Sequence, residues 1–340
     1  MGWFKPKLFL MLIITGLLIS ACGKQPASPT TAFADDLPAM KPTKTITLTQ
    51  LPSATHSPEP TSSPTHTETP TSTPTFTPTP DVRLDPADWQ NWPVVPTVSA
   101  RAKAIYEQGL QTGNYPDRFS KIGDCQNITT YFLAIFDNPD RYSLGPDYEY
   151  LQEAIDHFSG SYERESVATG GGMNVASVLS RYWVDLERCK GYETPLACEL
   201  RLQQPAIAII SMEETWGREN KVENYEKYMR QIIETVIAAG TVPVLATKAD
   251  NLEGDHLINQ ALARLAYEYD IPLWNFWSAV QPLPNHGLLE DGFHLSHGAN
   301  YFDEPANLKR AWPVRNLTAL QVIDAVWRGL NGLPLENGEW

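Results

Sequence analysis

The stretch Lys121-Ile122-Gly123-Asp124-Cys125-Gln126-Asn127 follows a short apolar segment, residues 118–122, and precedes a helix-like run over residues 129–136. A Gly-Asp turn between a strand and a helix presents one small side chain at the mouth of a sheet, where the first amide groups of the helix point. A nucleophile in this position gains exposure and an electrostatic partner. The stretch therefore predicts either a reactive thiol at Cys125 or an ordinary turn with a buried cysteine.

Strand-like and helix-like segments alternate around this stretch. The pattern predicts helices over residues 98–113, 129–136, 148–158, 175–182, 222–239, 257–269 and 317–330, and strands over residues 118–122, 206–210, 242–247 and 271–276. The run 206–210 is continuously apolar, which is typical of a parallel strand covered on both faces. The alternation predicts an α/β fold, a three-layer α/β/α sandwich with a mainly parallel sheet.

The amino end carries an export signal rather than folded structure. Lys5 and Lys7 precede an apolar run over residues 8–19, which is typical of a signal peptide over residues 1–21 and is short for a membrane span. The run ends in Leu-Ile-Ser-Ala-Cys22, which resembles a bacterial lipobox. That resemblance implies cleavage before Cys22 and lipidation of its thiol. The alternative is a plain signal peptide cut at another bond.

A spacer over residues 22–85 follows the signal. Of the 28 residues from Ser53 to Pro80, 22 are Ser, Thr or Pro, so the segment cannot bury enough apolar surface to fold. We expect an extended tether that holds the remaining domain, residues 86–340, outside the cytoplasmic membrane, lipid-anchored to its outer face at the cell surface. About 255 residues suffice for one domain with a full core.

The charge balance of the domain excludes one class of partner. Residues 1–80 hold five Lys and Arg against four Asp and Glu, and the whole chain has a net charge of −14, so residues 81–340 carry about −15. A domain this acidic repels phosphate backbones, and we therefore expect no nucleic-acid partner.

Export would place the cysteines of the domain in an oxidising compartment. Cys189 and Cys198 flank a turn-rich segment, and we expect them to form a local disulfide. A zinc site would need two further ligands nearby, and the sequence offers no obvious ones. Cys125 is then the odd thiol of the domain.

Polar clusters follow three of the predicted strands, at the carboxyl edge where ligands bind in such folds. They are Gly123-Asp124-Cys125, Ser211-Met212-Glu213-Glu214 and Lys248-Ala249-Asp250-Asn251. A fourth cluster is Asp291-Gly292-Phe293-His294. A carboxylate three residues before a histidine can hold the Nδ1 atom of the ring and leave Nε2 as a general base. The alternative is a loop in which the two side chains never meet.

Together these segments resemble the SGNH (GDSL-like) hydrolase family. The resemblance rests on the Gly123–Cys125 turn, the glycine run 170–172 and Asp291-x-x-His294, and it implies a flavodoxin-like fold and ester hydrolysis through an acyl-enzyme. By resemblance, Cys125 is the nucleophile, His294 the base and Asp291 its orienting partner. The amides of Cys125 and Gly172 would form the oxyanion hole.

The sequence departs from the family in two places. Cys125 replaces the serine nucleophile, and a thiol changes both the reactivity and the geometry of attack. Where the family has Gly-x-Asn-Asp, with an asparagine that binds the oxyanion, this chain has Met212-Glu213-Glu214-Thr215. Loss of such a donor costs about a hundred- to a thousandfold in rate. We expect Asp124, Glu213, Glu214, Lys248 and Asn251 to line the cleft, with Lys248 and Asn251 as substitute donors.

These observations predict a hydrolase for small-molecule or carbohydrate esters of the cell surface. The alternative is a tethered binding module that keeps the fold and the cleft but not the turnover. We expect a monomer, with no cofactor and no metal, that meets the membrane through its lipid anchor.

Overall fold

The computed structural model describes residue 81, residues 83–212 and residues 220–335. The predicted signal peptide, Cys22, nearly all of the spacer, and Glu213 and Glu214 lie outside the described residues. The strands are β1 (Tyr115–Gly123), β2 (Pro205–Ser211), β3 (Val242–Ala246) and β4 (Leu273–Trp274). The helices are α1 (Ala100–Thr112), α2 (Gly145–Tyr148), α3 (Gln152–His157), α4 (Pro195–Gln203), α5 (Val222–Ala238), α6 (Leu257–Tyr269), α7 (Phe276–Val280) and α8 (Ala311–Asn331).

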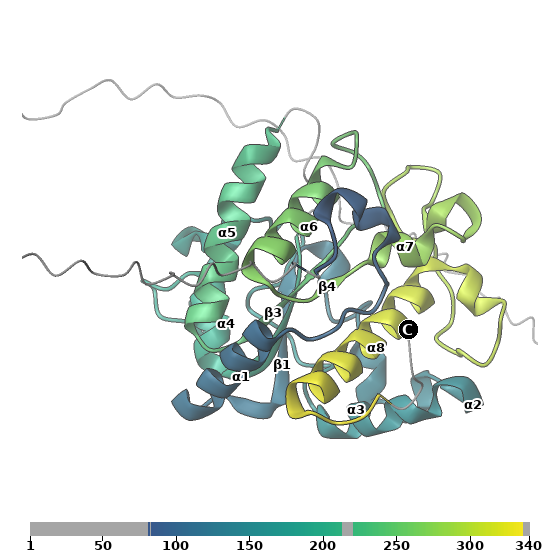
Figure 1. Cartoon of the computed structure of the whole chain (residues 1–340), viewed down its shortest axis with the longest axis horizontal. Coiled ribbons are helices and arrows are strands. Elements are labelled where there is room, and N and C mark those ends of the chain that lie inside the picture. The colour runs from purple at the N-terminus through teal and green to yellow at the C-terminus, as the bar shows by residue number, and fades with distance from the viewer. Residues whose placement is uncertain (1–80, 82, 213–219, 336–340) are drawn as a thin grey trace, which may run out of the picture. The chain divides into compact units, whose positions relative to one another are not determined.

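The four strands form one parallel sheet in the order β1-β2-β3-β4. Helices α4, α5 and α6 contact one another in sequence and cover one face, while α1 and α8 contact each other on the other face (Figure 1). Every residue of β2 is buried, because both faces of the sheet are covered. The prediction of an α/β fold with a parallel sheet between helical layers is therefore confirmed.

Local signals set the ends of the long helices. The hydroxyl of Ser99 accepts a hydrogen bond from the amide of Ala102 at the start of α1, and Gly113 ends that helix in the left-handed conformation. Helix α6 begins and ends where its apolar period predicts, and α5 ends within one residue of the expected position. Among the described residues, no helix has the length and apolar character needed to span a membrane.

Residues 129–136 do not form the predicted helix. They make turns followed by a 3-10 helix, η3 (Ala134–Asp137), and Leu133 has a φ of 67°. The side chain of Asn316 accepts a hydrogen bond from the amide of Leu133 at 2.8 Å and donates one to the carbonyl of Tyr131 at 3.2 Å. Because a side chain of α8 takes these backbone groups, the segment has less to gain from its own helical bonds.

Three other predicted elements are split, replaced by turns or cut short. Residues 148–158 are split by the 3-10 turn η5 (Glu149–Leu151), and residues 175–182 form only the 3-10 turns η6 (Ser177–Leu179) and η7 (Arg181–Trp183). The side chain of Asn174 accepts from the amides of Ala176 and Ser177, which favours a turn over a helix. The strand expected over residues 271–276 ends at Trp274, because the next residue, Asn275, caps α7.

A buried lysine lies in β1. Lys121 is 1% exposed, and its ammonium group donates to the carbonyl of Tyr162 at 2.7 Å and to the hydroxyl of Thr129 at 3.1 Å. Burial, with the nearby charge of Arg164, lowers the pKa of Lys121 from 10.5 to about 7. Between these two values the unfolded chain binds a proton that the folded chain does not, so the free energy of unfolding should rise with pH from about 7 to 10.5.

This burial predicts a pH-dependent effect of Lys121→Met. The variant removes a charge that burial opposes at pH 6, whereas at pH 9 the folded wild type already holds the amine neutral. In urea unfolding, the free energy of unfolding of the variant, relative to that of the wild type, should therefore be higher at pH 6 than at pH 9. Lys103→Met, at an exposed position of α1, is the control. Its free energy of unfolding should differ from that of the wild type by the same amount at both pH values. A pH-independent difference for Lys121→Met would contradict the prediction.

Candidate active site

The predicted nucleophile lies directly after β1, at the carboxyl edge of the sheet. Cys125 is half-buried and opens a single 3-10 turn, η2 (Cys125–Asn127), instead of the expected α-helix. The carboxylate of Asp124 is fully buried and accepts a hydrogen bond from the amide of Gln126 at 3.1 Å. Asp124 therefore shapes the turn and does not line a cleft. A turn of three residues also lacks the macrodipole that the sequence led us to expect beside the thiol.

A buried polar cluster fixes this turn to its neighbours. The side chain of Asn127 donates to the carbonyl of Ser211, at the end of β2, over 2.8 Å. Arg315 of α8 donates to the side-chain oxygen of Asn127 at 3.2 Å and to the hydroxyl of Ser211 at 2.9 Å. These contacts tie the ends of β1 and β2 to α8. Arg315 was not predicted as a site residue, because nothing in the sequence pattern of α8 distinguishes it from a surface arginine.

The predicted pair of Asp291 and His294 is formed. The Nδ1 atom of His294 lies 2.6 Å from the Oδ2 atom of Asp291, and the Oδ1 atom of Asp291 accepts from the amides of His294 and Phe293. The hydrogen bond from His294 holds the pKa of Asp291 at about 2, so this carboxyl is ionised at neutral pH. An ionised partner on Nδ1 fixes the tautomer in which Nε2 can accept a proton.

The other ring nitrogen of His294 is screened from solvent. Among the described residues no group hydrogen-bonds to Nε2, and this includes the thiol of Cys125. Half of the proposed constellation is thus assembled, and the hydrogen bond between base and nucleophile is not made. Catalytic hydrogen bonds of this kind are often long before substrate binds, and Nε2 of His294 keeps its acceptor site for one.

Helix α8 connects the loop of His294 to the turn of Cys125. The hydroxyl of Ser296 accepts from the amide of Ala311 at 2.9 Å, and the carbonyl of Ser296 accepts from the amide of Trp312 at 3.1 Å. One turn further along α8 lies Arg315, which contacts the turn of Cys125 through Asn127. Both candidate residues therefore lie at the carboxyl edge of the sheet, near the start of α8.

The glycine loop 170–172 lies beside the end of β1. The amide of Gly170 donates to the carbonyl of Gly123 at 3.3 Å, and Gly123 forms a parallel bridge with Thr169. Gly172 is exposed and has a φ of 79°, a conformation that favours glycine. The loop thus lies next to the turn of Cys125, where the predicted oxyanion donor of Gly172 would have to be.

The expectation that Lys248 lines the cleft is wrong. Its side chain is 1% exposed, and its ammonium nitrogen lies 2.8 Å from Asp250 and 2.6 Å from Glu253. These two carboxylates compensate the buried charge, so the ammonium group cannot serve an oxyanion. Asn251 is exposed and caps the loop before α6, accepting from the amide of His256 at 2.8 Å.

The aromatic and histidine residues near this edge are largely structural. Trp274 is fully buried and donates to the hydroxyl of Thr318, and Trp277 packs against Trp89 with ring centroids 4.9 Å apart. Neither side chain stacks in a cleft. His256 lies between Trp89 and Trp277, and burial lowers its pKa.

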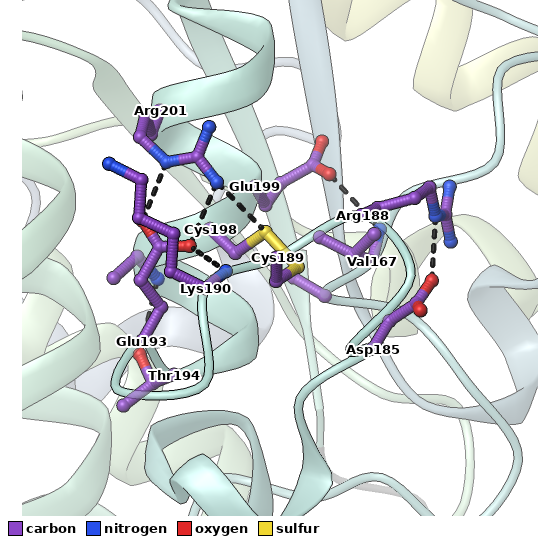
Figure 2. Close-up of a disulfide and its surroundings, with 12 residues drawn as sticks. Val167, Asp185, Arg188, Cys189, Lys190, Glu193, Thr194, Cys198, Glu199 and Arg201 are labelled. Atoms are coloured by element: carbon purple, nitrogen blue, oxygen red, sulfur yellow. Dashed lines mark hydrogen bonds and ion pairs between the residues drawn. A yellow bond between two sulfur atoms is a disulfide. The ribbon is translucent and has the colours of Figure 1, made fainter.

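The structure contains the disulfide between Cys189 and Cys198, with Cα atoms 5.6 Å apart (Figure 2). With Glu193, these sulfur atoms form a group of the size that could hold a metal ion, within the part of the chain that the structure describes. Since both sulfurs are bonded to each other, they are not available as thiolate ligands. Arg201 pairs with Glu193 through two hydrogen bonds of 2.6 and 2.8 Å and holds the pKa of Glu193 at about 2.

No protein-family model matches the chain, and no curated protein matches it. Among solved structures, the chain is similar to one described as "Crystal Structure of TesA", with a TM-score of 0.37 and 16% sequence identity. The match covers 64% of this chain and 99% of that chain. A likeness this distant does not define an activity.

The polar cluster predicts a strict requirement for glycine at position 123. A methyl group on Gly123 would lie 2.1 Å from the amide nitrogen of the Asn127 side chain and 2.5 Å from the carbonyl oxygen of Ser211. Gly123→Ala should therefore lower the free energy of unfolding by about 1–3 kcal/mol in urea denaturation. Gly171→Ala is the matched control, because nothing lies within 4 Å of its added methyl. Equal stabilities of the two variants would show that the cluster does not constrain the turn.

Proposed function

We propose that this protein is a hydrolase of the SGNH type that acts on esters with Cys125 as nucleophile, His294 as base and Asp291 as orienting carboxylate. The observation that carries the proposal is the formed Asp291–His294 pair, whose outer nitrogen is screened and unbonded at the edge where Cys125 is half-exposed. An unbonded ring nitrogen facing away from an ionised carboxylate is the arrangement that a general base needs.

The chemistry follows from the three groups. The Nε2 atom of His294 takes the thiol proton, and the sulfur of Cys125 attacks the ester carbonyl to form a thioester. The same proton passes to the departing alcohol. Water then attacks the thioester with His294 as base, which releases the acid and restores the thiol. The backbone amides of Cys125 and Gly172 are the proposed donors to the oxyanion in both steps.

Variants of the three residues test the proposal. The purified chain should hydrolyse short-chain nitrophenyl esters, and Cys125→Ala should reduce the rate to background. Asp291→Asn should lower the rate by about 10³- to 10⁴-fold, since a triad without its carboxylate loses the correct tautomer. Cys125→Ser, which keeps an attacking oxygen, should fall between the parent and Cys125→Ala. Equal rates in the parent and Cys125→Ala would exclude the thiol as nucleophile.

The pH dependence separates the roles of the two ionisable partners. Because the pKa of Asp291 is held at about 2, its carboxylate remains charged throughout the range in which most esters can be assayed. Protonation of Asp291 should therefore cause no loss of rate between pH 7 and pH 4, and Asp291→Glu should leave the acid limb of the pH profile in place. An acid limb that moved with the carboxylate would assign that limb to Asp291.

A tethered binding module is the second candidate. The ammonium group of Lys248 is held by two carboxylates, so it cannot replace the asparagine that the third segment lacks. A site with one oxyanion donor fewer loses about a hundred- to a thousandfold in rate, and it can keep its affinity. The nitrophenyl assay distinguishes the candidates, because a binding module would give equal background in all variants.

The proposal includes a place for this activity at the cell surface. The lipobox-like segment and the Ser-, Thr- and Pro-rich spacer support export and lipidation at Cys22, and the substrate we propose for a domain at that surface is a carbohydrate ester. Cells that express the chain should incorporate radiolabelled palmitate into it, and Cys22→Ser should abolish the label. Cys125→Ser is the control, and incorporation that survived Cys22→Ser would place the lipid elsewhere.

A further inference from the structure

An exposed aromatic surface follows the glycine loop in the chain. Four large apolar side chains of the segment 181–192 face solvent, and we call them the aromatic loop: Tyr182 at 85% exposure, Trp183 at 47%, Leu186 at 72% and Tyr192 at 73%. Single exposed apolar residues need no explanation, but four within eleven positions concentrate exposed apolar area in one segment, as binding surfaces do.

From this surface we infer a site for a β-1,4-linked pyranose chain beside the proposed ester site. The ring of Trp183 offers a flat apolar face, and the rings of Tyr182 and Tyr192 each offer the face opposite a cation, since Arg181 lies 5.3 Å from the first ring centroid and Lys190 lies 5.9 Å from the second. The N–H and O–H groups of these side chains can bind hydroxyls at the ring edges. An equatorially linked sugar ring has the complementary form, with C–H groups on its faces and hydroxyls around its rim. The inference depends on the proposed function only for the statement that the bound polymer carries the ester.

Contacts connect the aromatic loop to the candidate active site. The Cη2 atom of Trp183 lies 3.9 Å from the point where a side chain on Gly172 would begin. The same glycine loop is bonded to Gly123 through the amide of Gly170. A chain of contacts therefore runs from Trp183 through the glycine loop to the residue two positions before Cys125. A polymer on the aromatic loop can thus reach the edge of the sheet.

Covalent and polar contacts hold the carboxyl-terminal part of the aromatic loop, which favours binding because less conformational entropy is lost there. The disulfide joins Cys189 to Cys198 of α4, and Arg188 pairs with Asp185 at 2.7 Å (Figure 2). The amide of Lys190 donates to Glu193 at 2.8 Å. Next to Cys198, the buried carboxylate of Glu199 accepts from the hydroxyl of Ser120 in β1 at 2.6 Å. The loop is thereby fixed to the strand that leads to Cys125.

The charges around the loop favour a carbohydrate over a lipid surface. Asp185 and Glu187 flank Leu186, so insertion of this leucine into a membrane would bring two carboxylates to the headgroups. The domain carries about −15, which opposes approach to anionic lipid. The segment 181–192 itself has three basic and two acidic residues, a mixed surface that suits a polar ligand with neutral rings.

Titration of the full chain with cellohexaose and chitohexaose tests the inference. Binding of at least one oligomer is expected by isothermal titration calorimetry. Trp183→Ala and Tyr192→Ala should each weaken it by about threefold or more, and the double variant by about tenfold or more. Tyr115→Ala is the matched control, since Tyr115 is an exposed tyrosine at the amino end of β1. The affinity of this variant for the oligomers should equal that of the parent. Unchanged melting temperatures exclude unfolding as the cause.

Two outcomes overturn the inference. Either both oligomers fail to bind, or the double variant binds them with the same affinity as the parent. Sedimentation with vesicles of phosphatidylglycerol and phosphatidylethanolamine is the second arm, and vesicle binding without oligomer binding would assign the loop to the membrane. Cys125→Ala separates this test from that of the proposed function. If the chain binds oligomers but hydrolyses no ester, the binding surface survives and the hydrolase does not.

Discussion

The buried guanidinium group of Arg315 holds together the edge of the sheet on which the site depends. A charge removed from water is costly unless polar partners surround it. Here the side chains of Asn127 and Ser211 accept hydrogen bonds from it, and the rings of Phe132, Trp274 and Phe276 lie 4.8, 5.2 and 4.9 Å from its carbon. The planar cation thus joins two strand ends to one helix, and its burial leaves these partners little freedom to move.

This constraint explains how residues far apart in the chain share one edge. Trp312 and Arg315 are three residues apart on α8 and therefore lie near the same face of the helix. The first is bonded to the loop of His294 through Ser296, and the second to the turn of Cys125 through Asn127. The relative position of the candidate base and nucleophile is thus set by one turn of one helix and not by the long loops between them.

The sequence predicts those parts of the fold that depend on local periodicity. Helices α5 and α6 and strand β2 lie where their apolar patterns place them, because burial of one face decides their structure. The helix expected over residues 129–136 does not form because Asn316, 183 positions after Leu133, takes its backbone groups. No local pattern carries that information.

The same distinction applies to the site. The pair Asp291 and His294 could be predicted, since a carboxylate and a ring three residues apart meet within one turn of chain. The burial of Lys248 could not be predicted, because it depends on whether two nearby carboxylates are buried with it. Here Asp250 and Glu253 both are. Arg315 was missed for the opposite reason, since its partners come from β1 and β2.

The pair of Asp291 and His294 is partly exposed, so its strength depends on what a bound ligand covers. The side chains of His294 and Asp291 are 33% and 48% exposed, so water screens the interaction between them. A pair of this kind gains strength when a ligand excludes solvent from it. A small ester covers little of the edge, whereas a polymer held by the aromatic loop would extend over the glycine loop toward Cys125. A loop that positions a long substrate and a half-exposed acid–base pair are therefore complementary features, because the first supplies the desolvation that the second lacks.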